Sequence, residues 1–149
     1  MNDELLKLKN QLCFPLYAAA KAVVRQYAPL LDEIGLTYTQ YIVMMVLWER
    51  GKATVKELGE RLYLDSGTLT PLLKRLEAKQ IVARERSGDD ERQVNIAITE
   101  KGTQLKEKAA EIPGKISKCI PLSTDEAKML YSLLYKLLEN IDMQDDARD

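Results

Sequence analysis

Two cysteines, Cys13 and Cys119, have the most reactive side chains in this 149-residue sequence. They lie too far apart for a CxxC metal knuckle, and two cysteines are too few for a disulfide framework. In a reducing compartment such residues are either small buried hydrophobic side chains or reactive thiols, and the residues alone leave both interpretations open.

The chain contains no histidine. Histidine is the commonest metal ligand and the commonest general base, so its absence excludes zinc hydrolases and Ser-His-Asp catalysis. We therefore expect no metal site, no cofactor and no enzymatic turnover.

The composition is that of an ordinary globular protein, with 46% hydrophobic and 30% charged residues. The net charge is −1 and the pI is about 5.7, which on its own argues against nucleic-acid binding. The longest apolar runs, such as Ile42–Trp48, fall far short of the roughly 20 residues that cross a membrane. With no secretion signal in the sequence, we expect one cytoplasmic domain spanning residues 1–149.

Helical periodicity dominates the first half of the chain. Pro15 predicts that the first helical stretch breaks and restarts around Cys13–Pro15, because proline is tolerated only in a first turn. Threonines and Gly51 mark the ends of the next helices. The predicted helices are residues 4–31, Thr37 or Thr39 to Arg50, Val55–Leu62 capped by Thr54, and about Ser66 to Lys79 or Gln80.

The period then changes to that of strands. Ile81–Arg86 and Gln93–Ile98 flank a polar turn and predict a β-hairpin. A helix capped by Thr99 follows, with an interruption at Pro113–Gly114 and an end at Pro121. Ser123 and Glu126 form a capping box for a final amphipathic helix that reaches about residue 141.

This order of elements predicts a mainly α fold with a small β-hairpin, in the winged helix-turn-helix layout. In that layout a second helix enters the major groove of DNA. Leu69, Leu72, Leu73 and Leu76 have core spacing. The candidate DNA contacts are Ser66, Thr68, Thr70, Lys74 and Arg75 on the helix, and Arg84, Arg86 and Arg92 on the hairpin, with Asp90 orienting Arg92.

Two features oppose a simple DNA-binding interpretation. Residues 65–95 carry six basic and six acidic side chains, as a solvated helix and hairpin also would. Pro71 would lie inside the helix if Ser66 were its cap, whereas a cap at Thr70 would shorten the helix.

The chain resembles the MarR family, and within it the organic-hydroperoxide-sensing, OhrR-like and SarZ-type repressors. The matching stretches run from about residue 8 to 140. They are Gln11–Phe14, Tyr17, Tyr27, Leu36–Tyr38, Leu62–Leu73, Asp90–Arg92 and Ile98–Thr99.

The resemblance implies a homodimeric repressor that binds a pseudo-palindromic operator in double-stranded DNA. The winged helix-turn-helix would span about residues 36–98, between dimerisation helices at about 4–31 and 100–141. Ser66, Thr68 and Thr70 would approach DNA, and the Asp90–Arg92 wing would reach the minor groove.

The resemblance also implies that Cys13 is oxidised by an organic hydroperoxide or other oxidant, with Tyr27 and Tyr38 donating hydrogen bonds to its sulfur. The positive end of the helix that starts near Cys13 would favour the thiolate. Oxidation would end in a disulfide with Cys119 of the partner subunit, or in a mixed disulfide with a low-molecular-weight thiol. The alternative function is a MarR-type repressor induced by a small phenolic ligand, held among Tyr17, Tyr27, Tyr38 and Trp48.

Overall fold

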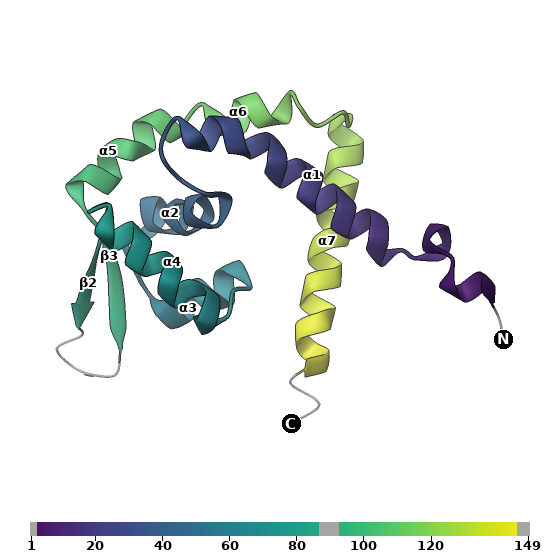
Figure 1. The fold of residues 1–149 in the computed structure, drawn as a ribbon, viewed down its shortest axis with the longest axis horizontal. Helices are drawn as coiled ribbons and strands as arrows, with labels where there is room; N and C mark the ends of the chain where they lie inside the picture. Colours follow the sequence, from purple (N-terminus) through teal and green to yellow (C-terminus); the bar gives the residue numbers. More distant parts are fainter. Residues whose placement is uncertain (1–2, 87–92, 146–149) are drawn as a thin grey trace. The chain divides into compact units, whose positions relative to one another are not determined.

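A computed structural model describes residues 3–86 and 93–145, with side chains up to residue 141. The chain forms two compact units, Met1–Ile116 and Ser117–Asp149. The fold is mainly helical with one small antiparallel sheet, as the sequence predicts (Figure 1).

The first unit begins with two short 3-10 helices, η1 (Asp3–Leu6) and η2 (Leu8–Asn10), followed by α1 (Cys13–Asp32). Pro15 is the third residue of α1, where its missing N–H costs no helical bond. The predicted break and restart at Cys13–Pro15 is therefore confirmed.

The next two helices begin at capping boxes. Thr37 accepts a hydrogen bond from the backbone N–H of Gln40 and starts α2 (Tyr38–Arg50), which Gly51 ends with φ 77°. Thr54 makes the equivalent bond with Glu57 and starts α3 (Val55–Leu62). The predicted boundaries of both helices are confirmed.

The helix α4 (Ser66–Ala78) starts differently from either prediction. Its cap is Asp65, so the expectation of a cap at Ser66 or Thr70 was wrong. The Asp65 carboxylate accepts from the Thr68 backbone N–H at 2.8 Å and from the Thr68 hydroxyl at 3.1 Å. Pro71 lies inside α4 and removes only the bond that its N–H would give to Gly67.

The sheet has three strands in the order β1-β3-β2: β1 (Lys52–Thr54), β2 (Val82–Arg86) and β3 (Val94–Ile98). Residues Val82–Arg86 pair with Val94–Ile98 in antiparallel register, which confirms the hairpin. The sequence did not predict β1, which pairs Ala53 with Ile96.

The core of the first unit lies between α2, α4 and the sheet. Leu69, Leu72, Leu73 and Leu76 of α4 are buried, as their spacing predicts. They pack with the buried side of α2, which includes Val43, Met44 and Leu47, while α1 buries only Leu31.

Two helices follow the sheet, α5 (Glu100–Ala109), capped by Thr99, and α6 (Ile112–Ser117). Pro113 and Gly114 lie within α6. The predicted interruption there was wrong: the break falls at residues 110–111, because Pro113 is accommodated in a first turn.

The second unit is dominated by α7 (Thr124–Asp145). Ser123 and Glu126 form the predicted capping box, with hydrogen bonds of 2.8 and 3.3 Å between the backbone N–H of each residue and the side chain of the other.

Candidate nucleic-acid interface and redox site

The exposed side of α4 carries the predicted helix contacts. Ser66, Thr68, Thr70, Lys74 and Arg75 are all exposed, whereas the leucines between them face the core. The Thr68 hydroxyl and N–H are engaged by Asp65, and these bonds hold the pKa of the Asp65 carboxyl below its usual range. One carboxylate therefore already occupies the positive end of α4.

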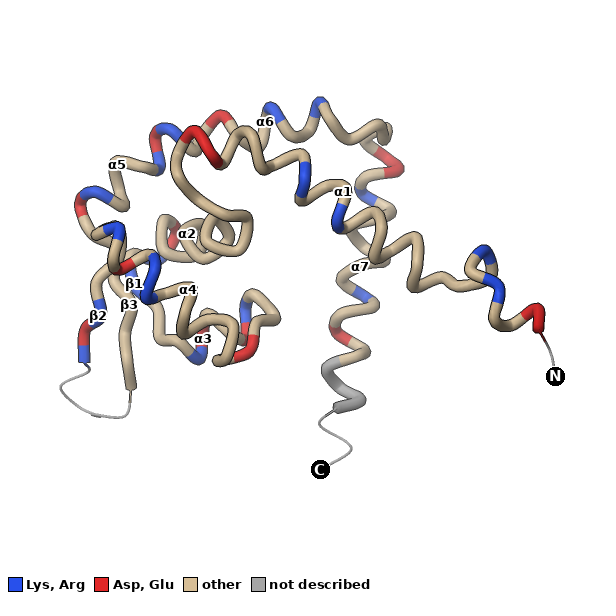
Figure 2. Tube along the Cα trace, in the orientation of Figure 1, with Lys and Arg blue, Asp and Glu red and all other residues tan. Residues whose placement is uncertain are grey.

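The cations on α4 and β2 differ in their partners. Arg84 Nε lies 3.4 Å from Glu77 Oε2, so this arginine joins β2 to α4. Within residues 3–86 and 93–141, Lys74, Arg75 and Arg86 form no ion pair. Figure 2 shows the two basic positions of β2 separated by Glu85. The predicted wing residues Asp90 and Arg92 lie outside the described residues.

Tyr27 and Tyr38 form a ring pair between α1 and the start of α2. Their centroids are 4.9 Å apart, and Tyr41 lies 5.9 Å from Tyr27. Burial raises the pKa of Tyr27 and Tyr38, so both phenols keep their protons as hydrogen-bond donors.

Cys13 is exposed as the first residue of α1, a helix start that no described side chain caps. Tyr27 is on the same helix, 14 residues further along. At a rise of about 1.5 Å per residue, α1 separates the two by about 21 Å. The tyrosine pair and Cys13 of one chain therefore do not meet.

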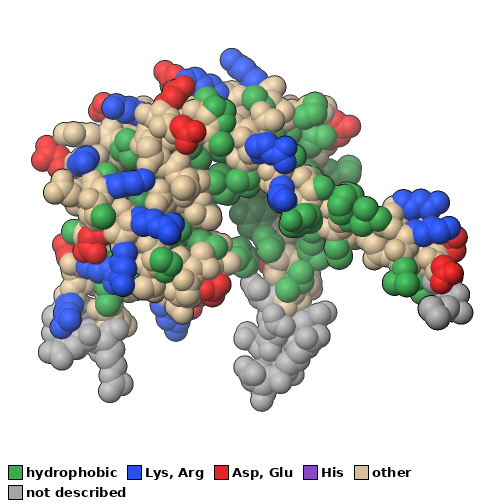
Figure 3. Space-filling view, viewed as in Figure 1, with side chains coloured by type: hydrophobic (Ala, Val, Ile, Leu, Met, Phe, Trp, Pro, Cys, Tyr) green, Lys and Arg blue, Asp and Glu red, His purple; other side chains and the backbone are tan. Residues whose placement is uncertain are grey.

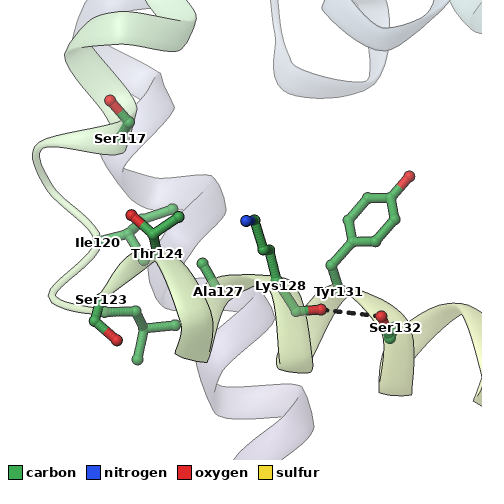
Figure 4. Close-up of a pocket in the computed structure, with 9 residues that line it drawn as sticks. Ser117, Ile120, Ser123, Thr124, Ala127, Lys128, Tyr131 and Ser132 are labelled. Atoms are coloured by element: carbon green, nitrogen blue, oxygen red, sulfur yellow. Dashed lines mark hydrogen bonds between the residues drawn. The ribbon is translucent and has the colours of Figure 1, made fainter.

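Cys119 belongs to the second unit, in the connection between α6 and α7, and it is also exposed. A cavity of about 720 Å³ lies beside this connection. Ser117, Ser123 and Thr124 line it together with Lys128 and Tyr131 of α7, and Figure 4 shows the last two side chains directed to the same side of the helix.

Large apolar side chains are exposed at both ends of the chain. Leu12 is 83% exposed, and hydrophobic side chains gather along the N-terminal half of α1 (Figure 3). On α7 the exposed residues include Met129, Leu130, Tyr131, Leu133, Tyr135, Leu137 and Ile141. Large exposed apolar patches are typical of interaction surfaces, and α1 and α7 each carry several exposed apolar side chains.

A second cavity lies between α2 and α5, with a volume of about 390 Å³. Tyr41, Met45 and Trp48 line one side and Lys106 the other. Of the residues predicted to hold an aromatic ligand, Trp48 lines this cavity, whereas Tyr17, Tyr27 and Tyr38 are not among its lining residues.

The family described as transcriptional regulator SarA/Rot matches residues 25–109. The organic hydroperoxide resistance transcriptional regulator of Bacillus subtilis is 52% identical over 91% of this chain and 92% of that protein. The chain belongs to the OhrR-like, MarR/SarA-type transcriptional regulators. It is thus a DNA-binding regulator and not an enzyme.

Two further relatives agree with this assignment. The regulator SarZ of Staphylococcus aureus is 43% identical over 93% of this regulator and 94% of SarZ. AbfR of Staphylococcus epidermidis superposes with a TM-score of 0.73 at 38% identity, over 96% of this chain and 99% of AbfR. AbfR structures comprise reduced and overoxidized forms bound to DNA and a disulfide-formed protein.

Sequence reasoning missed two residues, Glu77 and Lys79, whose side chains join α4 to other elements. Glu77 engages Arg84, and Lys79 reaches back to the α1–α2 turn, where it donates to the Gly35 carbonyl. The spacing of charges gives no signal for either contact, because each partner lies on a different element.

Among the helices that the structure describes, none combines the length and the apolar character that a membrane span needs.

Proposed function

We propose that this regulator is a homodimeric repressor that releases double-stranded DNA when an organic hydroperoxide oxidises Cys13. The observation that carries the proposal is the exposed position of Cys13 at the first residue of α1, in a chain 52% identical to an organic hydroperoxide resistance regulator. The winged helix-turn-helix at about 36–98 and the helices on either side act as one functional domain.

DNA is bound by α4 in the major groove and by the β2–β3 wing beside it. Ser66 and Thr70 approach the bases and phosphates, with Lys74 and Arg75 on the phosphate backbone. The Thr68 hydroxyl donates its hydrogen bond to Asp65, so Thr68 contacts DNA through its methyl group or as a hydrogen-bond acceptor. Arg86 and Arg92 reach the minor groove or its phosphates, and Asp90 orients Arg92.

The exposed apolar faces of α1 and α7 support a homodimer. A two-fold dimer places two copies of α4 on half-sites about 34 Å apart, which implies a pseudo-palindromic operator. A dimer also doubles the number of phosphate contacts, which compensates for the few cations of α4 and β2 that form no ion pair within the described residues.

The redox step begins when the Cys13 thiolate attacks the distal oxygen of the hydroperoxide. The O–O bond breaks, the distal oxygen stays on Cys13 with its proton as a sulfenic acid, and the leaving alkoxide takes a proton from solvent to become the alcohol. The thiol of Cys119 of the partner subunit then attacks that sulfur, which releases water and forms the disulfide. Because α1 separates Cys13 from Tyr27 and Tyr38 of its own chain, any hydrogen bond from this tyrosine pair comes from the partner subunit.

The AbfR structures support the disulfide as the species that releases DNA. Both reduced and overoxidized AbfR are bound to DNA, so overoxidation is compatible with the DNA complex in that relative. We therefore place the switch at the covalent link, which pulls on the dimerisation helices and changes the spacing of the two α4 helices.

The test uses DNA that the reduced protein selects from a random-sequence duplex pool. Wild type, Cys13→Ser and Cys119→Ser are treated with one equivalent of cumene hydroperoxide and, in a separate series, with an excess. Non-reducing gels, intact mass and fluorescence anisotropy then follow the covalent state and DNA affinity. A low-molecular-weight thiol is added in a parallel arm.

We expect a covalent dimer and loss of DNA binding in wild type only. Cys119→Ser treated with excess peroxide is expected to carry two or more added oxygens and to stay on DNA. Release from Cys119→Ser that requires the added thiol would assign resolution to a mixed disulfide. A wild-type protein whose Cys13 gains neither oxygen nor a disulfide would contradict peroxide sensing.

A second candidate is a repressor induced by a small aromatic ligand. The cavity between α2 and α5 favours it, because its volume and its Tyr41–Trp48 lining suit a small planar molecule. In that case Cys13→Ser would still release DNA when salicylate is added, and Trp48 fluorescence would report the binding.

A further inference from the structure

The C-terminal end of α4 is tied to the turn between α1 and α2 by the side chain of Lys79. Its ammonium donates to the carbonyl oxygen of Gly35 at 2.5 Å and to Oε1 of Gln40 at 3.2 Å. All three residues belong to the first compact unit. These bonds cross from the proposed recognition helix to an element about forty residues earlier in the chain.

Gln40 is a buried polar side chain, 3% exposed, in an otherwise apolar core. The same Oε1 that receives Lys79 also accepts the backbone N–H of Thr37 at 3.1 Å, which completes the capping box of α2. A buried oxygen is stabilised by its donors, and here the two donors come from different elements. One amide oxygen therefore both starts α2 and holds the end of α4.

The turn that receives Lys79 also places Tyr38. Tyr38 is the first residue of α2, and its ring packs against Tyr27 of α1 at 4.9 Å. A shift of this turn therefore changes the tyrosine pair and the acceptors of Lys79 together.

The backbone carbonyl groups at the end of α4 accept hydrogen bonds from side chains of α5 and of Thr99, the residue before α5. Lys101 donates to the Lys79 carbonyl at 2.9 Å, and the Thr99 hydroxyl donates to the Gln80 carbonyl at 2.8 Å. The Lys79 ammonium is therefore not needed to cap its own helix. Its two acceptors are both in the α1–α2 region, at the opposite end of α4 from the exposed Ser66 and Thr70.

We propose that Lys79 is a positioning residue that sets the placement of the recognition helix by tying its C-terminal end to the turn carrying Tyr38. It acts on DNA through α4 and makes no phosphate contact of its own. Changes at the Tyr27–Tyr38 pair reach α4 through this tie.

The test compares Lys79→Met, Lys79→Gln and Lys79→Arg with Lys74→Met, a variant of an exposed lysine on the same helix. Operator affinity of the reduced proteins is measured by anisotropy from 50 to 300 mM salt, on the DNA that wild type selects. Thermal unfolding at equal protein concentration verifies that each variant is folded.

We expect Lys79→Met to bind about tenfold more weakly with an unchanged salt slope, because a charge-assisted hydrogen bond is removed but the number of released counterions stays the same. Lys79→Gln keeps a single donor group, so its operator affinity is expected to lie between those of Lys79→Met and wild type. Lys79→Arg is expected to bind as wild type does. Lys74→Met is expected to lower the slope by about 0.9 for each phosphate that the lysine neutralises. Wild-type affinity in Lys79→Met and Lys79→Gln would overturn the proposal, as would a slope reduced as in Lys74→Met.

A second arm rests on the proposed function and compares DNA affinity before and after peroxide treatment. Lys79→Met is expected to form the covalent dimer as wild type does, with a smaller ratio of reduced to oxidised affinity. If Lys79→Met shows the same ratio of reduced to oxidised DNA affinity as wild type, the proposal that Lys79 transmits changes at the tyrosine pair to α4 is overturned. If wild type itself forms no covalent dimer, the proposed function fails, while the salt series still decides the role of Lys79.

Discussion

Replacing Gly102 by alanine is expected to lower the free energy of unfolding by about 1–3 kcal/mol. Gly102 is the third residue of α5 and is buried. A Cβ atom there would lie 2.2 Å from the Ile81 carbonyl oxygen and 2.9 Å from Cγ1 of Ile98. The Ile81 carbonyl is held by the Thr99 N–H at 3.2 Å, so α5 must move away from the sheet instead.

The magnitude follows from three contributions. Forcing a carbon into this packed contact costs about 1–3 kcal/mol. Moving α5 also weakens the 2.8 Å bond from Trp48 Nε1 to the Gly102 carbonyl, which is worth about 1 kcal/mol. The higher helix propensity of alanine returns about 1 kcal/mol. The strain therefore dominates the net effect.

Urea denaturation at a fixed protein concentration measures this effect, with Trp48, the single tryptophan, as the fluorescent probe. Gly114→Ala is the matched control, because a Cβ at Gly114 has no heavy atom within 4 Å. We expect that variant to gain up to about 1 kcal/mol. A Gly102→Ala protein as stable as Gly114→Ala would refute the assigned close approach of α5 to Ile81.

The remaining predictions concern charge and assembly. Arg86→Ala is expected to lower the salt slope of operator binding by about 0.9 for each phosphate that Arg86 neutralises, whereas Arg84→Ala, whose guanidinium is paired with Glu77, is expected to leave the slope unchanged. Hydrogen bonds lower the pKa of Asp65 in the folded protein from its ordinary 3.8. Its stabilisation is therefore present above pH 3.8 and is lost as the pH falls through the lower folded-state pKa, so the wild-type urea midpoint is expected to drop more between pH 5 and 2.5 than that of Asp65→Asn. Leu133→Glu places a charge on the exposed apolar face of α7 and is expected to weaken dimerisation about 100-fold by analytical ultracentrifugation; an unchanged dimer would contradict the assigned surface.

Element boundaries were predictable where a single residue type marks a helix end. Thr37, Thr54 and Thr99 each accept from a backbone N–H three residues later, and this local bond does not depend on the rest of the fold. The strand β1 was not predictable in this way, because three residues cannot show alternation. Its pairing with β3 is decided by tertiary contact.

The start of α4 shows how two local signals compete. Serine, threonine and aspartate all suit an N-cap, and the sequence offers each of them near Pro71. Asp65 is the cap because its carboxylate accepts both the N–H and the hydroxyl of Thr68. The proline is then accommodated by giving up one bond inside the helix, while four leucines bury its inner face.

The exposure of the predicted α4 contacts followed from the helical period, whereas the pairings of charged side chains did not. The separation of Cys13 from Tyr27 follows from helix geometry once both are placed on one uninterrupted helix, α1. The pairing of Arg84 with Glu77 and the reach of Lys79 to Gln40 needed the fold, because they join elements that no periodicity relates.

The charge balance explains why regulation through the dimerisation helices would be effective. Arg84 forms an ion pair with Glu77, and Lys79 donates a hydrogen bond to the α1–α2 turn. Lys74, Arg75 and Arg86 remain as the described cations of α4 and β2 without an ion pair in that part of the chain. At about 0.9 per phosphate, these three residues in each of two subunits of the proposed dimer contribute about −5 to the salt slope of DNA binding, and Arg92 adds to that value if it contacts a phosphate. In the proposed dimer each subunit supplies only part of this electrostatic binding, so we expect affinity to depend on both subunits engaging the DNA together. The proposed disulfide, by changing the spacing of the two α4 helices, would then weaken binding without altering any residue proposed to contact DNA.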